Sequence, residues 1–277
     1  QPVIVAPGHE WRRPDLVKAN ATRFIVPINF PKAPNMPSDS DWERVSLDQL
    51  RAWDWSPENP ALLRKNGLEI ALTTHGLKDK KTFRENLAKI IERGLAKHDA
   101  LAALTTTPAQ LAGVADQLGT IETGKLANLV VVEGDYFDPK AKLKGVWIEG
   151  RWNTLEPEKL AWIEKKEEED NEKKDDEKPE EKKEDKPDER LARSPIGEDT
   201  VLESAAVLVR NATLWTSSKR GLLKNHDLLV VDGKIKQIGR NLQPPENTHV
   251  IDAKGKHVTA GLIDAHNHSM ILGSVNE

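Results

Sequence analysis

The sequence predicts a mixed α/β fold that combines βα units with a small β-sandwich-type domain made of two strand groups. Three observations lead to this prediction. Up to about residue 115, apolar runs of strand length alternate with helical patterns, which is typical of the βα units of a parallel sheet or barrel. From residue 116 the pattern changes to short strands separated by turns. After residue 200 this short-strand pattern returns.

The first region contains three apolar runs that we expect to be strands. They cover Val3–Ala6, Arg23–Ile28 and Leu68–Leu72, and the last of them ends at Thr73-Thr74-His75. A loop rich in Pro and Asn follows the second run, over 31–40. In a parallel sheet the carboxyl ends of these strands meet at one edge, which is where functional residues of a barrel lie.

Five helical segments are expected in the same region. The clearest covers 81–93, where Phe83, Leu87, Ile90 and Ile91 have the i, i+4, i+7, i+8 spacing of one buried stripe. In the last segment Thr107 and Pro108 read as N-cap and first helical residue. That last segment covers 107–114, and the other three cover 47–53, 60–66 and 97–105.

Two groups of short strands follow. Asp232-Gly233 is a hairpin signal, because a two-residue turn needs positive φ at both positions. Each group alone has unpaired edges and few strands, so pairing between the groups is physically attractive. The expected strands are Leu129–Val132 and Val146–Ile148 in the first group, and Ala206–Trp215, Asp227–Val231, Ile235–Ile238, His249–Asp252 and His257–Val258 in the second.

A charged run separates the two groups. Residues 164–190 contain fifteen acidic and nine basic side chains. This composition predicts a solvated linker with coil-like reach. A partly helical rod held by i,i+4 ion pairs is the alternative, although Pro179 and Pro187 interrupt it.

The remaining composition limits the class of protein. The 277 residues include no Cys, so there is no disulfide framework and no thiolate metal site. No apolar run reaches about 18 residues, so we expect no membrane span. No clustered basic face suggests nucleic-acid binding. Oligomeric state and compartment stay open: the chain could be cytoplasmic, or periplasmic or secreted if a signal peptide precedes Gln1.

Two histidines near the C-terminal end of the sequence carry the clearest chemical signal. The apolar run Leu262-Ile263, with Val258 before it, reads as a buried strand that ends at His266-Asn267-His268. Side chains at i and i+2 of a strand point to the same face, so both imidazoles can converge on one divalent metal ion. The alternative is a pair of surface histidines in a loop. Asp264 points to the opposite face and reads as structural.

The other histidines have weaker signals. His75 follows the third expected strand of the first region, and His9-Glu10 reads as a loop pair beyond the first. No catalytic residue and no organic cofactor site is assigned. Ordinary solvated residues are expected at His98, His226, His249 and His257.

The stretch Gly261–His268 resembles the amidohydrolase superfamily, in which a small β-domain leads into a (β/α)8 barrel whose first strand ends in a His-x-His metal pair. Here Ala260-Gly261 replaces the family's usual Pro-Gly. A second resemblance lies in 103–131, which is similar to the C-terminal end of an amidohydrolase, where the last barrel helix returns to the β-domain. There Ala127-Asn128 replaces Ala-Asp.

The resemblance implies that the C-terminal part of one unit precedes the N-terminal start of the next, as at the junction of two tandem units in a larger protein. A circular permutation would give the same order, but a barrel needs about 200 residues or more, and its middle strands are missing. The implied segments are 1–115 (βα units of a partial TIM-like barrel), 116–163 (C-terminal strands of a small β-domain), 164–200 (linker), 201–259 (N-terminal strands of a second β-domain) and 260–277 (first barrel strand).

The resemblance also implies an activity. The parent protein would be an enzyme that hydrolyses C–N bonds other than peptide bonds, amide or cyclic amide, in small molecules through metal-activated water. His266 and His268 would bind the metal, expected to be zinc, in an incomplete site, so the chain alone is expected to be inactive. Where the family's last barrel strand offers an Asp, this chain has Thr73-Thr74-His75, and His75 is a possible substitute. The alternative is a non-catalytic structural β-sandwich or linker module, or a degenerate unit.

Overall fold

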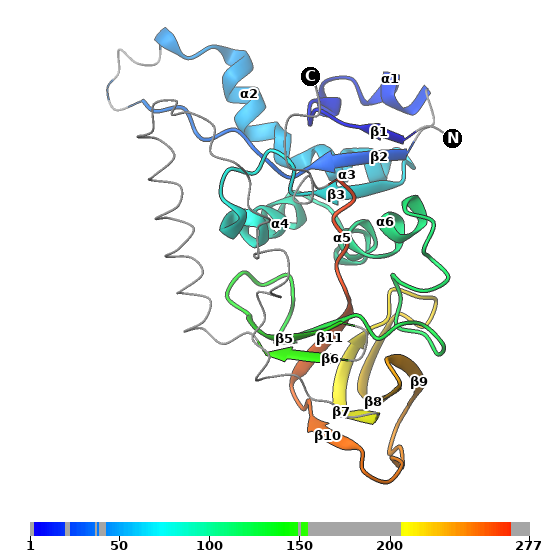
Figure 1. Cartoon of the computed structure of the whole chain (residues 1–277). Helices are drawn as coiled ribbons and strands as arrows, with labels where there is room; N and C mark the ends of the chain where they lie inside the picture. Colours follow the sequence, from blue (N-terminus) through cyan, green and yellow to red (C-terminus); the bar gives the residue numbers. More distant parts are fainter. Residues whose placement is uncertain are drawn as a thin grey trace, which may run out of the picture.

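The computed structural model describes residues 3–19, 23–36, 38, 43–148, 151–154 and 206–266. The predicted linker over 164–200 and the second predicted metal ligand, His268, lie outside these ranges. Figure 1 shows two parts: a small parallel sheet with its helices, and a larger sheet below it. The predicted mixed α/β class is confirmed.

The upper sheet has three parallel strands in the order β1-β2-β3. They are β1 (Val3–Val5), β2 (Arg23–Pro27) and β3 (Ile70–Thr73), in agreement with the predicted runs. All four residues of β3 and the three central residues of β2 are buried. A parallel strand covered on both faces needs such a continuous apolar run. β1 is different, because its three residues are exposed at the edge.

Helices surround this sheet (Figure 1). Ser46 and Gln49 form a capping box at the start of α2, so the helix begins at Leu47. In α4, Leu87 and Ile90 are buried, as the predicted stripe requires. The α-helices are α1 (Pro14–Ala19), α2 (Leu47–Trp55), α3 (Asn59–Lys65), α4 (Phe83–Glu92), α5 (Lys97–Leu104) and α6 (Thr106–Leu111), with short 3₁₀ turns at Glu10–Arg12, Ser56–Glu58 and Lys80–Thr82.

The predicted start of the last helix is wrong. α6 begins at Thr106, one residue after the end of α5, and Pro108 is its third residue rather than its first. The N–H groups of a helix's first turn have no partner within the helix, so Pro is tolerated beyond the first position as well. Thr105 lies between the two helices, and its hydroxyl donates to the carbonyl of Leu101.

The lower sheet contains both predicted strand groups. Its strand order is β6-β5-β4-β11-β7-β8-β9, and β10 pairs with β7 in parallel. The groups meet where β11 runs antiparallel to β4, with Lys256 opposite Glu133 and Ala260 opposite Leu129. The strands are β4 (Leu129–Glu133), β5 (Lys142–Ile148), β6 (Arg151–Thr154), β7 (Ala206–Trp215), β8 (Leu222–Val231), β9 (Lys234–Gly239), β10 (His249–Asp252) and β11 (Lys256–Ala260).

The segment before β4 lies against β9, the last strand of the sheet at that end. The backbone N–H groups of Gly124 and Ala127, just before β4, donate to the carbonyls of Ile235 and Gly233 at β9. Leu126 forms an isolated bridge with Lys234. The enclosed core takes buried residues from both strand groups: Leu129, Val131, Trp147, Val207, Val209, Leu214, Leu228, Val230, Ile235 and Val258.

β4 separates two cores. Val130 and Val132 pack with the helices and the upper sheet, whereas Leu129 and Val131 face the core of the lower sheet. Alternate side chains of a strand point to opposite faces, so the uninterrupted apolar run of β4 is what a strand between two cores requires. This strand therefore joins the two parts of the molecule.

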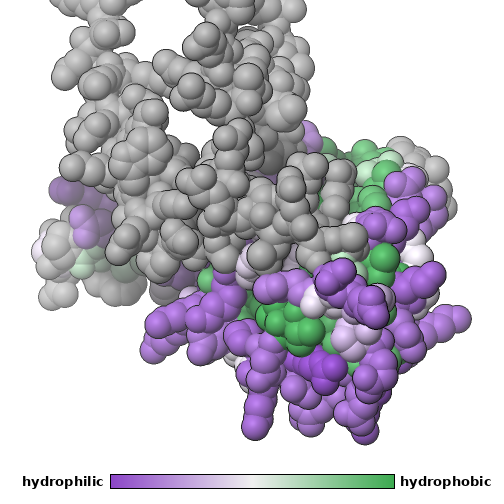
Figure 2. Space-filling model, turned by 60° about the horizontal axis from the view of Figure 1, so that its bottom comes forward, coloured by the Kyte–Doolittle hydropathy of each residue, from purple (hydrophilic) through white to green (hydrophobic). Residues whose placement is uncertain are grey.

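The face of the molecule shown in Figure 2 is largely polar over the described residues. Seen from below, apolar atoms form small patches between hydrophilic side chains. The large apolar residues that are exposed on the lower sheet come from different strands: Ile148, Leu222 and Val250. Within the described ranges, no helix is both long enough and apolar enough to span a membrane.

The predicted strand over Leu262-Ile263 is wrong for the residues that the structure describes. β11 ends at Ala260, and the chain continues without strand structure to a bend at Ala265-His266. This segment rises from the lower sheet past α5 to β3 (Figure 1). It bonds to the backbone of other segments through single hydrogen bonds, from Gly261 N to Asn128 O and from Ile263 N to Leu104 O. Leu262 packs against the upper core, so the apolar run reflects burial beside helices rather than strand pairing.

Candidate functional site

The carboxyl end of β3 meets the segment 261–266. The hydroxyl of Thr73 donates to the carbonyl oxygen of His266 over 2.8 Å. The backbone N–H of Thr74 donates to Oδ2 of Asp264 over 3.1 Å, and the Thr74 hydroxyl donates to the same oxygen over 2.5 Å. Residues far apart in the sequence are thereby held side by side at the strand end, where the active sites of such folds lie.

Two of the predicted site residues come together here. The imidazole rings of His75 and His266 have centroids 4.7 Å apart and planes at 89°, an edge-to-face contact. His75 is exposed and His266 is half-buried. The other member of the predicted pair, His268, lies outside the described residues.

Asp264 organises this corner, in agreement with its predicted structural role. Its Oδ1 accepts the backbone N–H of His266 over 3.1 Å, while Oδ2 accepts from Thr74. Burial by itself raises the pKa of this carboxyl group. Hydrogen bonds from Thr74, Thr73 and the backbone outweigh burial and hold the pKa below its usual value. Asp264 is therefore an ionised acceptor that fixes the bend.

The donor chemistry of this corner fits part of a divalent-metal site. Two imidazoles in contact are suitable ligands for zinc and related ions. A zinc site usually takes three protein ligands and a water, and among the described residues no group of three His, Cys, Asp or Glu stands close enough to hold an ion. His75 and His266 could therefore supply two of the ligands of such a site, and the described residues do not complete it.

The pair His9-Glu10 does not join this corner. Glu10 is buried, and its Oε2 accepts from the side-chain amide of Asn59 over 2.7 Å, which ties the turn after β1 to the start of α3. His9 is exposed. His9 lies in the loop, as expected, whereas Glu10 begins the 3₁₀ turn Glu10–Arg12, so the expected loop pair is confirmed only for His9.

His257 differs from the prediction that it is solvated. It is half-buried, and its Nδ1 accepts the indole N–H of Trp215 over 3.0 Å. Burial lowers the pKa of His257; Asp135 opposes this effect, and Lys224 and Lys97 add to it. Sequence pattern could not show this contact, because the indole lies on another strand. The remaining histidines, His98, His226 and His249, are exposed or half-buried at the surface, as expected.

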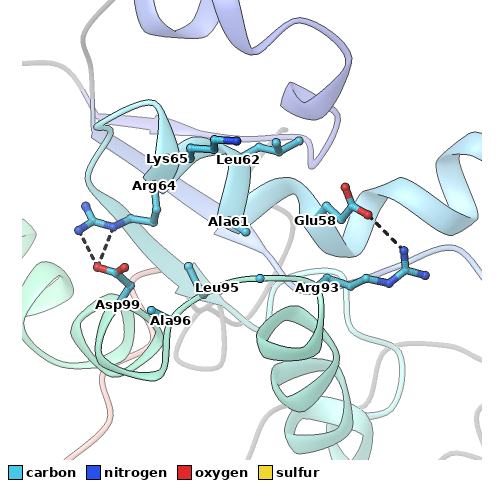
Figure 3. A pocket seen from close by; sticks show the side chains of 10 residues that line it. Glu58, Ala61, Leu62, Arg64, Lys65, Arg93, Leu95, Ala96 and Asp99 are labelled. Carbon is cyan, nitrogen blue, oxygen red and sulfur yellow. Dashed lines mark hydrogen bonds and ion pairs between the residues drawn. The ribbon is translucent and has the colours of Figure 1, made fainter.

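A cavity of about 470 Å³ lies elsewhere, between α3, α4 and the start of α5 (Figure 3). Arg64 pairs with Asp99 over 2.7 Å, and Arg93 contacts Glu58 over 3.2 Å. The arginines are thus neutralised by their own neighbours. The cavity adjoins the end of α3 that leads into β3, so it lies at the opposite end of the strand from His75.

Comparison with known proteins gives short but consistent matches. The amidohydrolase family matches residues 58–153. A dihydroorotase of Halalkalibacterium halodurans is 46% identical over 61 residues, 22% of this chain and 14% of that protein. An imidazolonepropionase of Klebsiella pneumoniae is 41% identical over 80 residues, 27% of this chain and 20% of that protein.

Longer matches have lower identity. The amidohydrolase tasK of Hapsidospora irregularis is 32% identical over 146 residues, 53% of this chain and 13% of that protein. An amidohydrolase from Thermotoga maritima, known from a crystal structure, is 28% identical with a TM-score of 0.41, covering 53% of this chain and 35% of that one. The chain thus spans a fifth or less of the length of the three curated relatives named.

Proposed function

We propose that this chain, which carries sequence of the amidohydrolase family, is part of a metal-dependent enzyme that hydrolyses C–N bonds other than peptide bonds. The observation that carries the proposal is the position of His266. It lies at the carboxyl end of β3, beside His75, where a barrel of this kind performs its chemistry. Enzymes named for such reactions, a dihydroorotase and an imidazolonepropionase, are among the relatives.

His266 and His268 would hold the metal, with zinc as the ion that suits imidazole ligands. When bound, the metal supplies an activated water for attack on the carbon of the C–N bond. Asp264 would orient His266 by accepting its backbone N–H, and Thr73 would hold the same residue by donating to its carbonyl oxygen. The substrate would be a small amide or cyclic amide.

The test uses the intact protein with amide and cyclic amide substrates. We expect His266→Ala and His268→Ala to lose both bound metal and hydrolytic activity, while His98→Ala, at an exposed helical site, keeps both. The proposal fails if the two variants retain the metal content and the activity of the unchanged protein.

We place the chain at the junction of two tandem units. Residues 1–163 would be the end of one unit, 164–200 a linker, and 201–277 the start of the next. The order of the two resemblances supports this arrangement. So does the length of the amidohydrolase tasK, since its 146 matched residues are 13% of that protein, which therefore has about 1,100 residues.

A second candidate is a non-catalytic role as a composite, sandwich-type β unit, alone or within a degenerate amidohydrolase. It is favoured by the antiparallel pairing of β11 with β4, which joins the strand groups into one sheet around one core. At the end of β3, Thr73-Thr74-His75 stands where the family usually has an Asp ligand. This difference also favours the non-catalytic role.

Limited proteolysis tests the composite unit. After cleavage within 164–190, we expect the two halves to co-elute in size-exclusion chromatography. In Val131→Pro, which removes a backbone donor and misfits a strand between two partners, the cleaved halves should separate. Separation of the unchanged halves would contradict a shared sheet.

A further inference from the structure

A group of aromatic and charged side chains lies where the lower sheet meets the upper part of the molecule. His257 of β11 stands opposite Val132 of β4, and antiparallel partners point to the same face of a sheet. Val132 packs against the upper core, so the side chain of His257 also lies on the face toward the upper part. Thr213 of β7 is its other cross-strand neighbour, so neither adjacent strand places a charge directly beside the ring.

Trp215 of β7 connects the lower sheet to the upper core. It packs against that core, whose buried residues all precede the predicted linker, whereas Trp215 follows it. Its ring lies edge to face with that of Phe137, with centroids 5.9 Å apart and planes at 79°. The contact between the two parts of the molecule therefore depends on the position of this indole.

The hydrogen bond between Trp215 and His257 requires a neutral imidazole. The indole N–H donates to Nδ1 of His257 over 3.0 Å. An indole nitrogen can only donate, so Nδ1 carries no proton, and the proton of the neutral ring is on Nε2. The ring planes are tilted by 43° with centroids 5.9 Å apart. One tautomer and one charge state therefore fit this contact.

Three elements besides the adjacent strands place charges around His257. Burial has the largest effect and lowers the pKa of His257; Asp135 in the loop after β4 raises this pKa, and Lys224 of β8 and Lys97 of α5 lower it further. Asp135 is already engaged, because Oδ2 accepts from Lys97 Nζ over 2.5 Å and Oδ1 accepts the backbone N–H of Phe137 over 3.0 Å. These surroundings favour the neutral ring that the indole contact needs.

We propose that protonation of His257 releases the indole of Trp215 and loosens the contact between the lower sheet and the upper part of the molecule. A protonated Nδ1 is a donor, so two donors then face each other with no acceptor between them. The half-buried indole N–H loses its partner, which favours movement of one of the rings. Because Trp215 also packs against Phe137, its movement weakens that contact. This pH-sensitive contact goes beyond the proposed function and does not depend on a metal.

NMR spectra of the intact, isotope-labelled chain between about pH 5 and 8 provide the test. The indole N–H signal of Trp215 is assigned by its absence in Trp215→Phe. We expect this signal to shift, and the N–H to exchange faster with solvent, as pH falls. Its midpoint should equal that of the imidazole signals of His257 and lie below 6.5, the ordinary pKa of histidine.

The nuclear Overhauser effect between the rings of Trp215 and Phe137 reports the contact between the two parts. We expect it to be lost on the acid side of the midpoint. The rings of Tyr136 and Phe137, with centroids 5.5 Å apart in one loop, provide an internal control whose signal should persist. Far-UV circular dichroism over the same range establishes that the helices and strands are retained.

Three variants make the test specific. His257→Gln keeps an acceptor that does not titrate, so the Trp215 signal should stay constant over the whole range. Lys97→Met removes a cation that opposes protonation, so the midpoint should move to higher pH. His98→Gln is the matched control, at the next residue of α5 and at a side chain that is 81% exposed, and should leave the midpoint unchanged.

Two results in the unchanged chain would overturn the inference at the hydrogen bond itself. One is a Trp215 signal that does not follow the titration of His257. The other is a His257 midpoint above 6.5, which would mean that Asp135 stabilises the charged ring in the closed contact. Persistence of the Trp215–Phe137 effect in acid would also contradict it, because the hydrogen bond would then titrate without loosening the two parts. None of these results bears on the metal site of the proposed function.

Discussion

Asp264 and Thr74 determine the geometry at the end of β3. The carboxylate accepts from a backbone N–H and a hydroxyl of Thr74 and from the N–H of His266. Hydrogen bonds to an ionised acceptor contribute more than neutral ones, and here they connect parts of the chain that no secondary structure joins. The position of His266 therefore depends on a side-chain contact.

Thr74→Val tests this dependence through its effect on the stability of the fold. The variant keeps the shape of the side chain but leaves Asp264 Oδ2 without its hydroxyl donor. We expect the free energy of unfolding in urea to fall by about 1–2 kcal/mol. Thr248→Val, which removes an exposed hydroxyl bonded to the carbonyl of Pro245, should stay within about 0.5 kcal/mol of the unchanged chain. Equal effects of the two variants would contradict the role of Thr74.

His257 links stability to pH. Burial has the largest effect and lowers the pKa of His257 in the folded chain. Asp135 raises this pKa, and Lys224 and Lys97 lower it further. A lowered folded pKa means that the neutral ring contributes stability above its ordinary value of 6.5, and that this contribution is lost as pH falls below 6.5 through the folded pKa. A protonated Nδ1 also cannot accept the Trp215 N–H.

We therefore expect the difference in unfolding free energy between the unchanged chain and His257→Gln to shrink as pH falls below 6.5. Glutamine keeps an acceptor for Trp215 and does not titrate. Lys224→Met removes one of the cations that lower the pKa, so its loss of stability in acid should be smaller. Urea titrations at several pH values between about 5 and 8 measure both effects. A difference that is constant across this range would contradict the account.

The sequence predicted part of the site. The placement of a histidine after β3 could be deduced from the local pattern. Asp264 was expected to be structural because it would point to the opposite face of a strand, whereas the structure has no strand there and Asp264 acts through hydrogen bonds at a bend. The contact of His75 with His266 could not, since it depends on the path that the chain takes past α5. The same holds for His257, whose partner Trp215 lies 42 residues away in the sequence.

The β9 hairpin illustrates an element whose conformation the sequence does determine. Asp232 and Gly233 have φ of 48° and 73°, so both are in the left-handed region that the two-residue turn requires. The turn fixes the register of β8 against β9, and the Gly233 carbonyl accepts the N–H of Ala127. A local turn thus supports the contact between β9 and the segment before β4.

Gly233→Ala should lower the free energy of unfolding by about 1 kcal/mol, because an alanine is strained at this φ. Asp232→Asn should remain within about 0.5 kcal/mol, since Asn tolerates the left-handed region. Urea midpoints of both variants provide the measurement. An alanine without cost would show that the turn relaxes to another conformation.

Most helices and strands were predicted within a few residues, because their apolar period is set by the core that they face. β4 reads as a buried run since Val130 and Val132 face one core and Val131 the other. The segment 261–266 contains the apolar pair Leu262-Ile263 but has no strand structure, because its contacts with other segments are separate hydrogen bonds to Asn128, Leu104 and the end of β3 rather than a ladder. Sequence pattern detects burial and does not identify the partner.

Across the whole molecule, sequence from both sides of the predicted linker contributes to each structural unit. The lower sheet joins β4 to β11, and the upper core receives Leu262 from the last described segment. The candidate site repeats this arrangement, with His75 from one side and His266 from the other. The family match covers residues 58–153, on one side of the linker. In the lower sheet, the strands of this region pair with strands that follow residue 205.

Metal content by elemental analysis, after dialysis of the purified chain against trace zinc, is the measurement to make first. We predict close to one zinc per chain, and its loss in the double variant His266→Ala/His268→Ala with the fold retained. A chain that holds no zinc, or a double variant that holds as much zinc as the unchanged chain, would contradict a metal site at the end of β3.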